Sequence, residues 1–111
     1  MSIYNNASKL AGEIKNSKEY KDFIENMRII KSDKDSENLL NEYKKVGYNL
    51  QRATMNNKKV DKKAIKKLEE IQNKIRYNEN IYNYLLAEEK FNIMMDSINK
   101  IIAEAVREDY K

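Results

Sequence analysis

The chain has 111 residues, a formal net charge of +4, two glycines, and no proline, cysteine or histidine. The missing cysteine and histidine exclude disulfides, thiolate chemistry, Cys/His zinc sites and the commonest general base. The scarcity of turn residues disfavours sandwiches and barrels and favours helices joined by short polar loops. We therefore predict one all-α domain over residues 1–111.

Two short amphipathic helices are predicted at the start of the chain. The first covers about residues 2–15, with Ser2 as its N-cap. The second covers about residues 18–31, with Ser17 as its N-cap and Glu19 near the positive end of the helix dipole. Their apolar faces recur at helical spacing: Ile3, Ala7, Leu10, Ala11 and Ile14, then Tyr20, Phe23, Ile24, Met27 and Ile30.

A third helix is predicted over about residues 34–55, after a choice of N-caps at Ser32 or Asp33. Asn56 and Asn57 end it. Gly47 lies inside its apolar seam and costs roughly 1 kcal/mol relative to alanine. We attribute this glycine to the close approach of another helix, with a hinge as the alternative. The seam, which steps by three and four residues, is Leu39, Tyr43, Val46, Leu50 and Ala53.

A fourth helix is predicted over about residues 61–77, with Asp61 as its N-cap. Val60 and Ile65 then occupy the hydrophobic-staple positions on either side of that cap. The helix has one narrow stripe, which consists of Ile65, Leu68, Ile71, Gln72 and Ile75.

The last third of the chain, about residues 78–107, is predicted to be one long helix with Asn78 as its cap. Such a helix is a rod of roughly 43 Å, whereas a compact monomer of this length has a diameter of only about 34 Å. The apolar stripe of this rod therefore exceeds what one small chain covers. We predict an elongated bundle of about five helices, completed by dimerisation. The candidate dimer or bundle interface is Tyr84, Phe91, Met95, Ile98 and Ile102.

Two polar features accompany the long helix. Glu88 interrupts an apolar row and is expected to pair with a Lys or Arg, or to cap a neighbouring helix end. Tyr77 and Tyr82 flank the break at Asn78 and are expected to cover that junction.

The most basic part of the chain is the basic segment, residues 58–67, which holds Lys58, Lys59, Lys62, Lys63, Lys66 and Lys67 against one acid, Asp61. These lysines have two interpretations: a phosphate-binding or membrane-surface patch, or the solvated face opposite Ile65, Leu68 and Ile71. We favour the solvated face, because the segment has no arginine fork and no interleaved aromatic residue. A nucleic-acid partner is the alternative prediction.

No catalytic, cofactor-binding or metal-ligating residue is predicted. The chain has no glycine-rich phosphate loop, nucleophile elbow or calcium-loop spacing. No apolar run approaches the roughly 18 residues of a membrane-spanning helix, and the N-terminus has no secretory signal. We therefore expect a cytoplasmic, non-enzymatic protein without a membrane partner.

The chain resembles the YlbF/YmcA family of small helical bacterial proteins, most closely its YheA-like branch. The similarity covers nearly the full length, and it rests mostly on core positions. The residues that carry it are Tyr4-Asn5-Asn6-Ala7 with Leu10 and Ile14, Ser17-Lys18-Glu19-Tyr20-Lys21, Leu39-Leu40 with Glu42-Tyr43, Asn78 with Ile81 to Leu85, Ala87-Glu88 before Phe91, and Ile98-Asn99-Lys100-Ile101-Ile102.

This resemblance implies an all-helical cytoplasmic protein that tends to dimerise. Better-studied relatives are non-enzymatic regulators that assemble with partner proteins, influence competence, sporulation and biofilm development, and affect RNA processing through an endoribonuclease. Some relatives ligate iron–sulfur clusters through cysteines. This chain has no cysteine, so that cofactor is not expected here. The resemblance thus favours a homodimeric regulatory adaptor.

Overall fold

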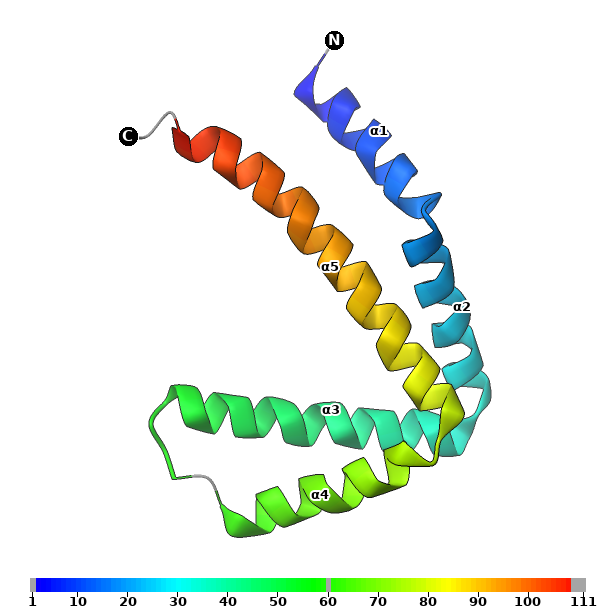
Figure 1. The fold of residues 1–111 in the computed structure, drawn as a ribbon, viewed down its shortest axis with the longest axis vertical. Coiled ribbons are helices and arrows are strands. Elements are labelled where there is room, and N and C mark those ends of the chain that lie inside the picture. The colour runs from blue at the N-terminus through cyan, green and yellow to red at the C-terminus, as the bar shows by residue number, and fades with distance from the viewer. Residues whose placement is uncertain (1, 60, 109–111) are drawn as a thin grey trace. The chain divides into compact units, whose positions relative to one another are not determined.

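The computed structural model describes residues 2–59 and 61–108, which form five α-helices and no strand (Figure 1). The predicted all-α fold with a long C-terminal helix is confirmed, and every predicted helix end lies within one residue of the observed one. The helices are α1 (Ile3–Lys15), α2 (Lys18–Ser32), α3 (Lys34–Met55), α4 (Lys62–Arg76) and α5 (Glu79–Glu108).

Short polar side chains fix where these helices begin. The Ser2 Oγ accepts from the Asn5 N–H at 3.1 Å, as an N-cap should, and thereby satisfies one orphan donor of α1. The same role belongs to each predicted cap: Ser17, Asp33, Asp61 and Asn78. At the other end of α3, Asn57 has a φ of 55°, which asparagine tolerates at a helix end. The predicted staple includes Val60, which lies outside the described residues.

The chain divides into two compact units, which we call unit 1 and unit 2. Unit 1 comprises Met1–Met27 and Tyr84–Lys111, and unit 2 comprises Arg28–Asn83. Both α2 and α5 therefore contribute residues to each unit. The single domain expected from the length stays a prediction.

Unit 2 is built on an antiparallel pair of helices, α3 and α4, whose backbones run side by side (Figure 1). Each of the two helices has one apolar face. The most buried apolar side chain is Leu40 on α3 and Ile71 on α4. Ile30 and Ile81 are the other buried apolar residues of this unit. The pairing follows from the two predicted stripes, because each narrow apolar face needs a surface to cover it.

Unit 1 is held by aromatic rings from α2 and α5. Phe23 stacks on Phe91, with ring centroids 5.1 Å apart and an interplanar angle of 10°. Phe23 also lies 5.7 Å from the ring of Tyr84, and Tyr20 lies 5.9 Å from the ring of Phe91. Such pairs contribute about 0.5–1.5 kcal/mol each beyond their buried area. We call these four residues the aromatic cluster.

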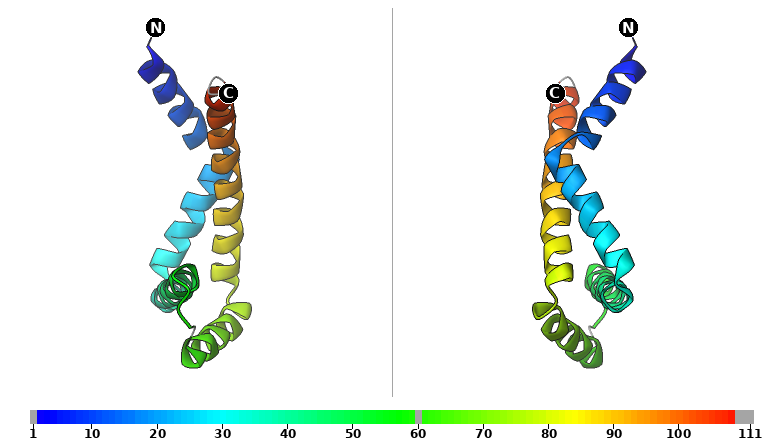
Figure 2. Two further views of the ribbon diagram at one scale, coloured as in Figure 1. Left: turned by 90° about the vertical axis from the view of Figure 1, so that its left-hand side faces the viewer. Right: turned by 90° about the vertical axis from the view of Figure 1, so that its right-hand side faces the viewer.

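The first helix is packed far less than the rest of unit 1. None of its residues is buried. Figure 2 shows α1, in dark blue, diverging from the red end of α5 in both side views. Its predicted apolar face is therefore formed but largely uncovered.

Two expectations are wrong. A Cβ added at Gly47 would meet nothing within 4 Å, so no neighbouring helix of this chain approaches that glycine closely in the described residues. Tyr77 and Tyr82 are both exposed, at 86% and 63%, and so they do not cover the junction around Asn78. A polar network, described below, occupies that junction instead.

Candidate interaction surface

The five predicted interface residues follow α5 from a buried end to an exposed end. Tyr84 is buried and Phe91 is half-buried, and both belong to the aromatic cluster inside unit 1. Met95 and Ile98 are half-buried, whereas Ile102 is 54% exposed. The first two thus serve packing within the chain. The assignment of this stripe to a dimer interface stays a prediction.

Beyond Ile98 the stripe continues without cover. We call this part the distal strip: Ile101, Ile102, Ala105 and Val106. Ile101 is 70% exposed and Val106 is 54% exposed. In the same unit, Ile3 and Tyr4 of α1 are each 82% exposed. Large exposed apolar patches often mark sites of association, so these uncovered side chains are the candidate surface.

Sequence reasoning missed a second exposed apolar pair on α5. Leu86 is 40% exposed and Ile93 is 58% exposed. They are seven residues apart and, at 100° per residue, lie on a face turned away from Phe91 and Ile98. The seven-residue spacing was visible in the sequence, but the stronger stripe on the other face obscured it.

Glu88 accepts a hydrogen bond within its own helix, and its expected pairing with a Lys or Arg stays a prediction. The Tyr84 hydroxyl donates to the Glu88 Oε2 at 2.8 Å, one turn along α5. This bond gives the buried tyrosine a polar partner, as a buried phenol requires. The arrangement supports a structural role for this carboxylate.

A polar network at the start of α3 and α5 was also missed by sequence reasoning. The Ser36 Oγ donates to the Asp33 Oδ2 at 2.5 Å and accepts from the Asn78 Nδ2 at 2.8 Å. The Asn80 Nδ2 donates to the same Asp33 oxygen at 3.5 Å. Two helix caps are therefore joined through one buried hydroxyl. We call Asp33, Ser36, Asn78 and Asn80 the polar clasp.

The polar clasp shifts the titration of its carboxylate. The hydrogen bond from the Ser36 side chain, followed by smaller contributions from the Ser36 backbone and Asn80, holds the pKa of Asp33 below its ordinary value. These donors stabilise the charged form, which outweighs the opposing effect of partial burial. The charged Asp33 carboxylate therefore contributes to holding the starts of α3 and α5 together.

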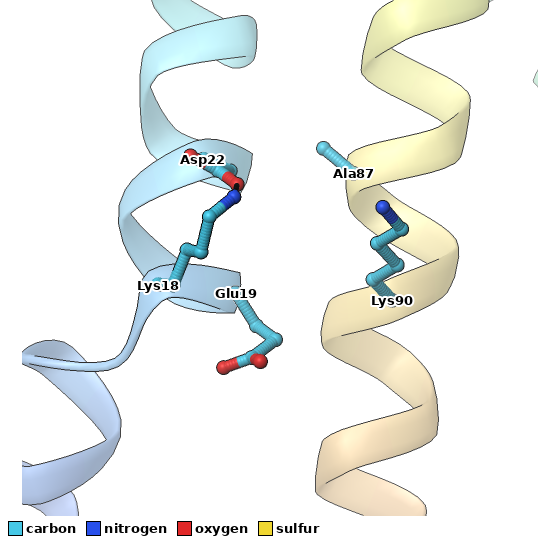
Figure 3. Close-up of a pocket in the computed structure, with 5 residues that line it drawn as sticks. All are labelled: Lys18, Glu19, Asp22, Ala87 and Lys90. Carbon is cyan, nitrogen blue, oxygen red and sulfur yellow. Dashed lines mark hydrogen bonds and ion pairs between the residues drawn. The ribbon is translucent and has the colours of Figure 1, made fainter.

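A small hollow lies between α2 and α5 within unit 1 (Figure 3). It has a volume of about 120 Å³, and Lys18, Glu19, Asp22, Ala87 and Lys90 line it. The Lys18 Nζ donates to the Asp22 Oδ2 at 2.7 Å, and this bond raises the pKa of Lys18. The hollow is well below the roughly 300 Å³ of a small-molecule site, and its charges are balanced. We assign it no ligand.

The lysines of the basic segment all lie on the surface. Lys58 and Lys59 follow the end of α3. On α4, Lys62 and Lys66 lie opposite the buried Ile71 and Lys63 lies to the side, whereas Lys67, one turn before Ile71, lies on the side that faces α3. Lys67 makes an ion pair with Glu42 of α3, with its Nζ 3.4 Å from the Glu42 Oε1. Lys62 and Lys66 therefore lie on the outer face of α4, and Lys67 lies at the edge of the α3–α4 contact. Whether these lysines bind anything stays a prediction.

Within residues 2–59 and 61–108, no group of three or more acidic side chains is arranged to hold a metal ion. No helix in that part of the chain combines the length and the apolar character needed to cross a bilayer.

Comparison with known proteins places nearly the whole chain in one family. Residues 3–107 match the family model described as "Control of competence regulator ComK, YlbF/YmcA". A UPF0342 protein of Halothermothrix orenii is 32% identical over 92% of this chain and 86% of its own length. A UPF0342 protein of Desulfitobacterium hafniense is 30% identical over 96% of this chain and 86% of its own length.

Two solved structures share the fold. A Bacillus stearothermophilus protein described as a Protein of Unknown Function (DUF964) has a TM-score of 0.78, with 13% identity over 96% of this chain and 93% of its own. A chain of the X-ray structure of Bacillus subtilis RicA in complex with RicF has a TM-score of 0.65, with 18% identity over 98% of this chain and 96% of its own. At these identities the likeness concerns the fold alone.

Proposed function

Because this chain belongs to the YlbF/YmcA family, we propose that it is a non-enzymatic helical interaction module that pairs with a second copy of itself and serves as a regulatory adaptor. The regulated process would be bacterial development or RNA processing, as in the better-studied relatives. The proposal has two parts, self-association and partner binding, which different observations support.

The distal strip of α5 carries the self-association part. The helix has 30 residues and is therefore a rod of about 45 Å. Its first turns pack through the aromatic cluster, whereas Ile101, Ile102 and Val106 remain more than half exposed. Burial of apolar area stabilises by roughly 25 cal/mol per Å², so pairing of two distal strips would remove a substantial unfavourable exposure.

Partner binding is supported by the family and by the second structural neighbour. The family model refers to control of a competence regulator, and the RicA structure contains a second protein, RicF. Neither observation concerns a reaction. Because the chain has no histidine or cysteine, a catalytic role would also lack the commonest general base and any thiolate nucleophile.

Analytical ultracentrifugation tests the first part. We expect a monomer–dimer equilibrium at micromolar concentration, and a strict monomer would eliminate self-association. Affinity purification from the native cell tests the second part. We expect at least one specific protein that remains bound after nuclease treatment and a high-salt wash, and recovery of none would eliminate the adaptor role.

One observation favours a second function, a weak association with nucleic acid. All six lysines of the basic segment are exposed, and they lie within ten residues of each other. Neutralised phosphates release counterions, so any such binding must weaken steeply as salt rises. A salt titration with RNA decides this alternative: binding that is insensitive to salt, or absent at low salt, eliminates it.

A further inference from the structure

We propose that a groove between α3 and α4 docks an acidic segment of a protein partner, with one apolar side chain on the groove floor and carboxylates on its lysine rim. This inference rests on the proposed function only in assuming that the adaptor has a protein partner. It concerns unit 2, whereas the proposed dimer surface lies in unit 1. The groove has a volume of about 310 Å³ and is lined by Glu42, Lys45, Val46, Asn49, Ala64 and Lys67.

The floor of the groove is apolar and is formed where the two helices face each other. Val46 from α3 and Ala64 from α4 are both half-buried, and each is a small side chain. The volume is at the lower end of the range for binding pockets. It suits one branched aliphatic or aromatic side chain, in the manner of a helix that inserts an anchor into a groove.

The surroundings of the groove are strongly cationic. Residues 42–67, which include every residue that lines the groove, contain nine Lys or Arg residues against Glu42 and Asp61, a net charge of +7. The rest of the chain then sums to −3, because the total is +4. An excess of positive charge on one helical pair attracts partners of the opposite sign and speeds their encounter. Charge complementarity therefore selects an acidic partner.

The rim contains a contact that the partner would replace. Lys67 is paired with Glu42 at 3.4 Å, and their side chains are 58% and 44% exposed. Exposed pairs of this kind add little stability, so exchange of Glu42 for a carboxylate of the partner costs little. Lys45 lies on the same rim and offers a second ammonium group.

An acidic protein segment fits this groove better than a nucleic acid does. Phosphates would use the lysines but would leave the apolar floor of Val46 and Ala64 without a role. The lining of the groove also contains no arginine and no aromatic residue for base stacking. An amphipathic acidic helix uses both features of the groove.

The test uses the full chain and a labelled synthetic helix in which a single leucine is flanked, at four-residue spacing, by glutamates. We expect saturable binding that weakens as salt rises.

Reversal of the rim charges in Lys45→Glu/Lys67→Glu should weaken binding by about tenfold or more, because two attractive pairs become repulsive. Ala64→Leu fills the floor while retaining every charge, and it should weaken binding to a similar extent. Amide chemical shifts of the wild-type protein on titration should change at Val46 and Ala64.

Matched controls separate this site from general electrostatics. Lys9→Glu/Lys21→Glu makes the same change of net charge on exposed residues of unit 1 and should leave binding nearly unchanged. A peptide with glutamines in place of the glutamates should bind poorly. Equal loss in the control variant, shift changes away from the groove, or no binding at all would overturn the inference. Binding of oligouridylate RNA through the same residues, without the peptide, would also overturn it. Sedimentation of the same samples reports the dimer, so a failure here is distinguishable from a failure of self-association.

Discussion

Shortening the side chains of the distal strip to alanine should weaken self-association while leaving the stability of the monomer nearly unchanged. Ile101 and Ile102 are 70% and 54% exposed, so more than half of each side chain is still available for burial by a partner. Removing a buried methylene costs about 0.8 kcal/mol, and Ile→Ala removes the equivalent of three. Allowing for partial cover, each truncation should cost about 1 kcal/mol of association free energy.

The variant Ile101→Ala/Ile102→Ala therefore removes four such side chains from a symmetric dimer, which amounts to about 4 kcal/mol. This corresponds to an increase in the dimer dissociation constant of about a thousandfold. Monomer stability should change by no more than about 0.5 kcal/mol, because the residues are exposed and alanine favours the helix. Sedimentation equilibrium measures the first quantity, and urea denaturation monitored by circular dichroism measures the second.

Leu86→Ala/Ile93→Ala is the matched control, because it removes exposed apolar atoms from the face of the same helix that is turned away from Ile98 and Ile102. The control dimer should dissociate no more readily than the wild type. If the control weakens the dimer as much as the test variant, the stripe containing Ile98 and Ile102 is not the interface. An unchanged dissociation constant in the test variant would refute the reasoning from exposure altogether.

Three further predictions concern the fold. Ser36→Ala leaves Asp33 and Asn78 without their shared partner at a site that is 1% exposed. It should lower the free energy of unfolding, measured by urea denaturation, by about 1–3 kcal/mol. A loss below about 0.5 kcal/mol would contradict the polar clasp. Phe91→Ala removes two ring contacts from a half-buried site and should lower the free energy of unfolding by about 2 kcal/mol. Tyr48→Ala, at a 63% exposed tyrosine, should change it by no more than about 0.5 kcal/mol. Equal losses would show that the aromatic cluster does not hold unit 1. The pKa of Asp33 is lowered in the folded state, so its contribution to stability is present above its unfolded pKa and is lost as pH falls from about 4 through the folded value. Asp33→Asn should therefore reduce the loss of unfolding free energy at acid pH in a stability–pH profile. An unchanged loss would exclude Asp33 as its cause.

Helix positions could be predicted because their determinants are local. Ser2, Ser17, Asp61 and the other caps each act on an amide two or three residues away, and that spacing is visible in the sequence. The apolar faces of the helices could be predicted equally well, since they depend only on the helical period. Both signals lie within a few turns of chain.

The failures depend on which segments meet in space. Ser36 and Asn78 are 42 residues apart, so nothing in their spacing indicated that two caps would share one hydroxyl. Gly47 was assigned a neighbour because helical glycines often permit close approach, but here the surrounding space is open. The groove at Val46 and Ala64 likewise needs the register of α3 against α4, which periodicity alone does not specify.

The polar clasp has a further consequence for the chain between its two halves. Since the first turns of α3 and α5 are joined side chain to side chain, the chain between them departs from and returns to one point. Segments with adjacent ends tolerate exchange and changes of length, because replacing them does not stretch the scaffold. The α3–α4 hairpin of this chain can therefore change in length or in charge while Asp33, Ser36 and Asn78 hold its two ends together.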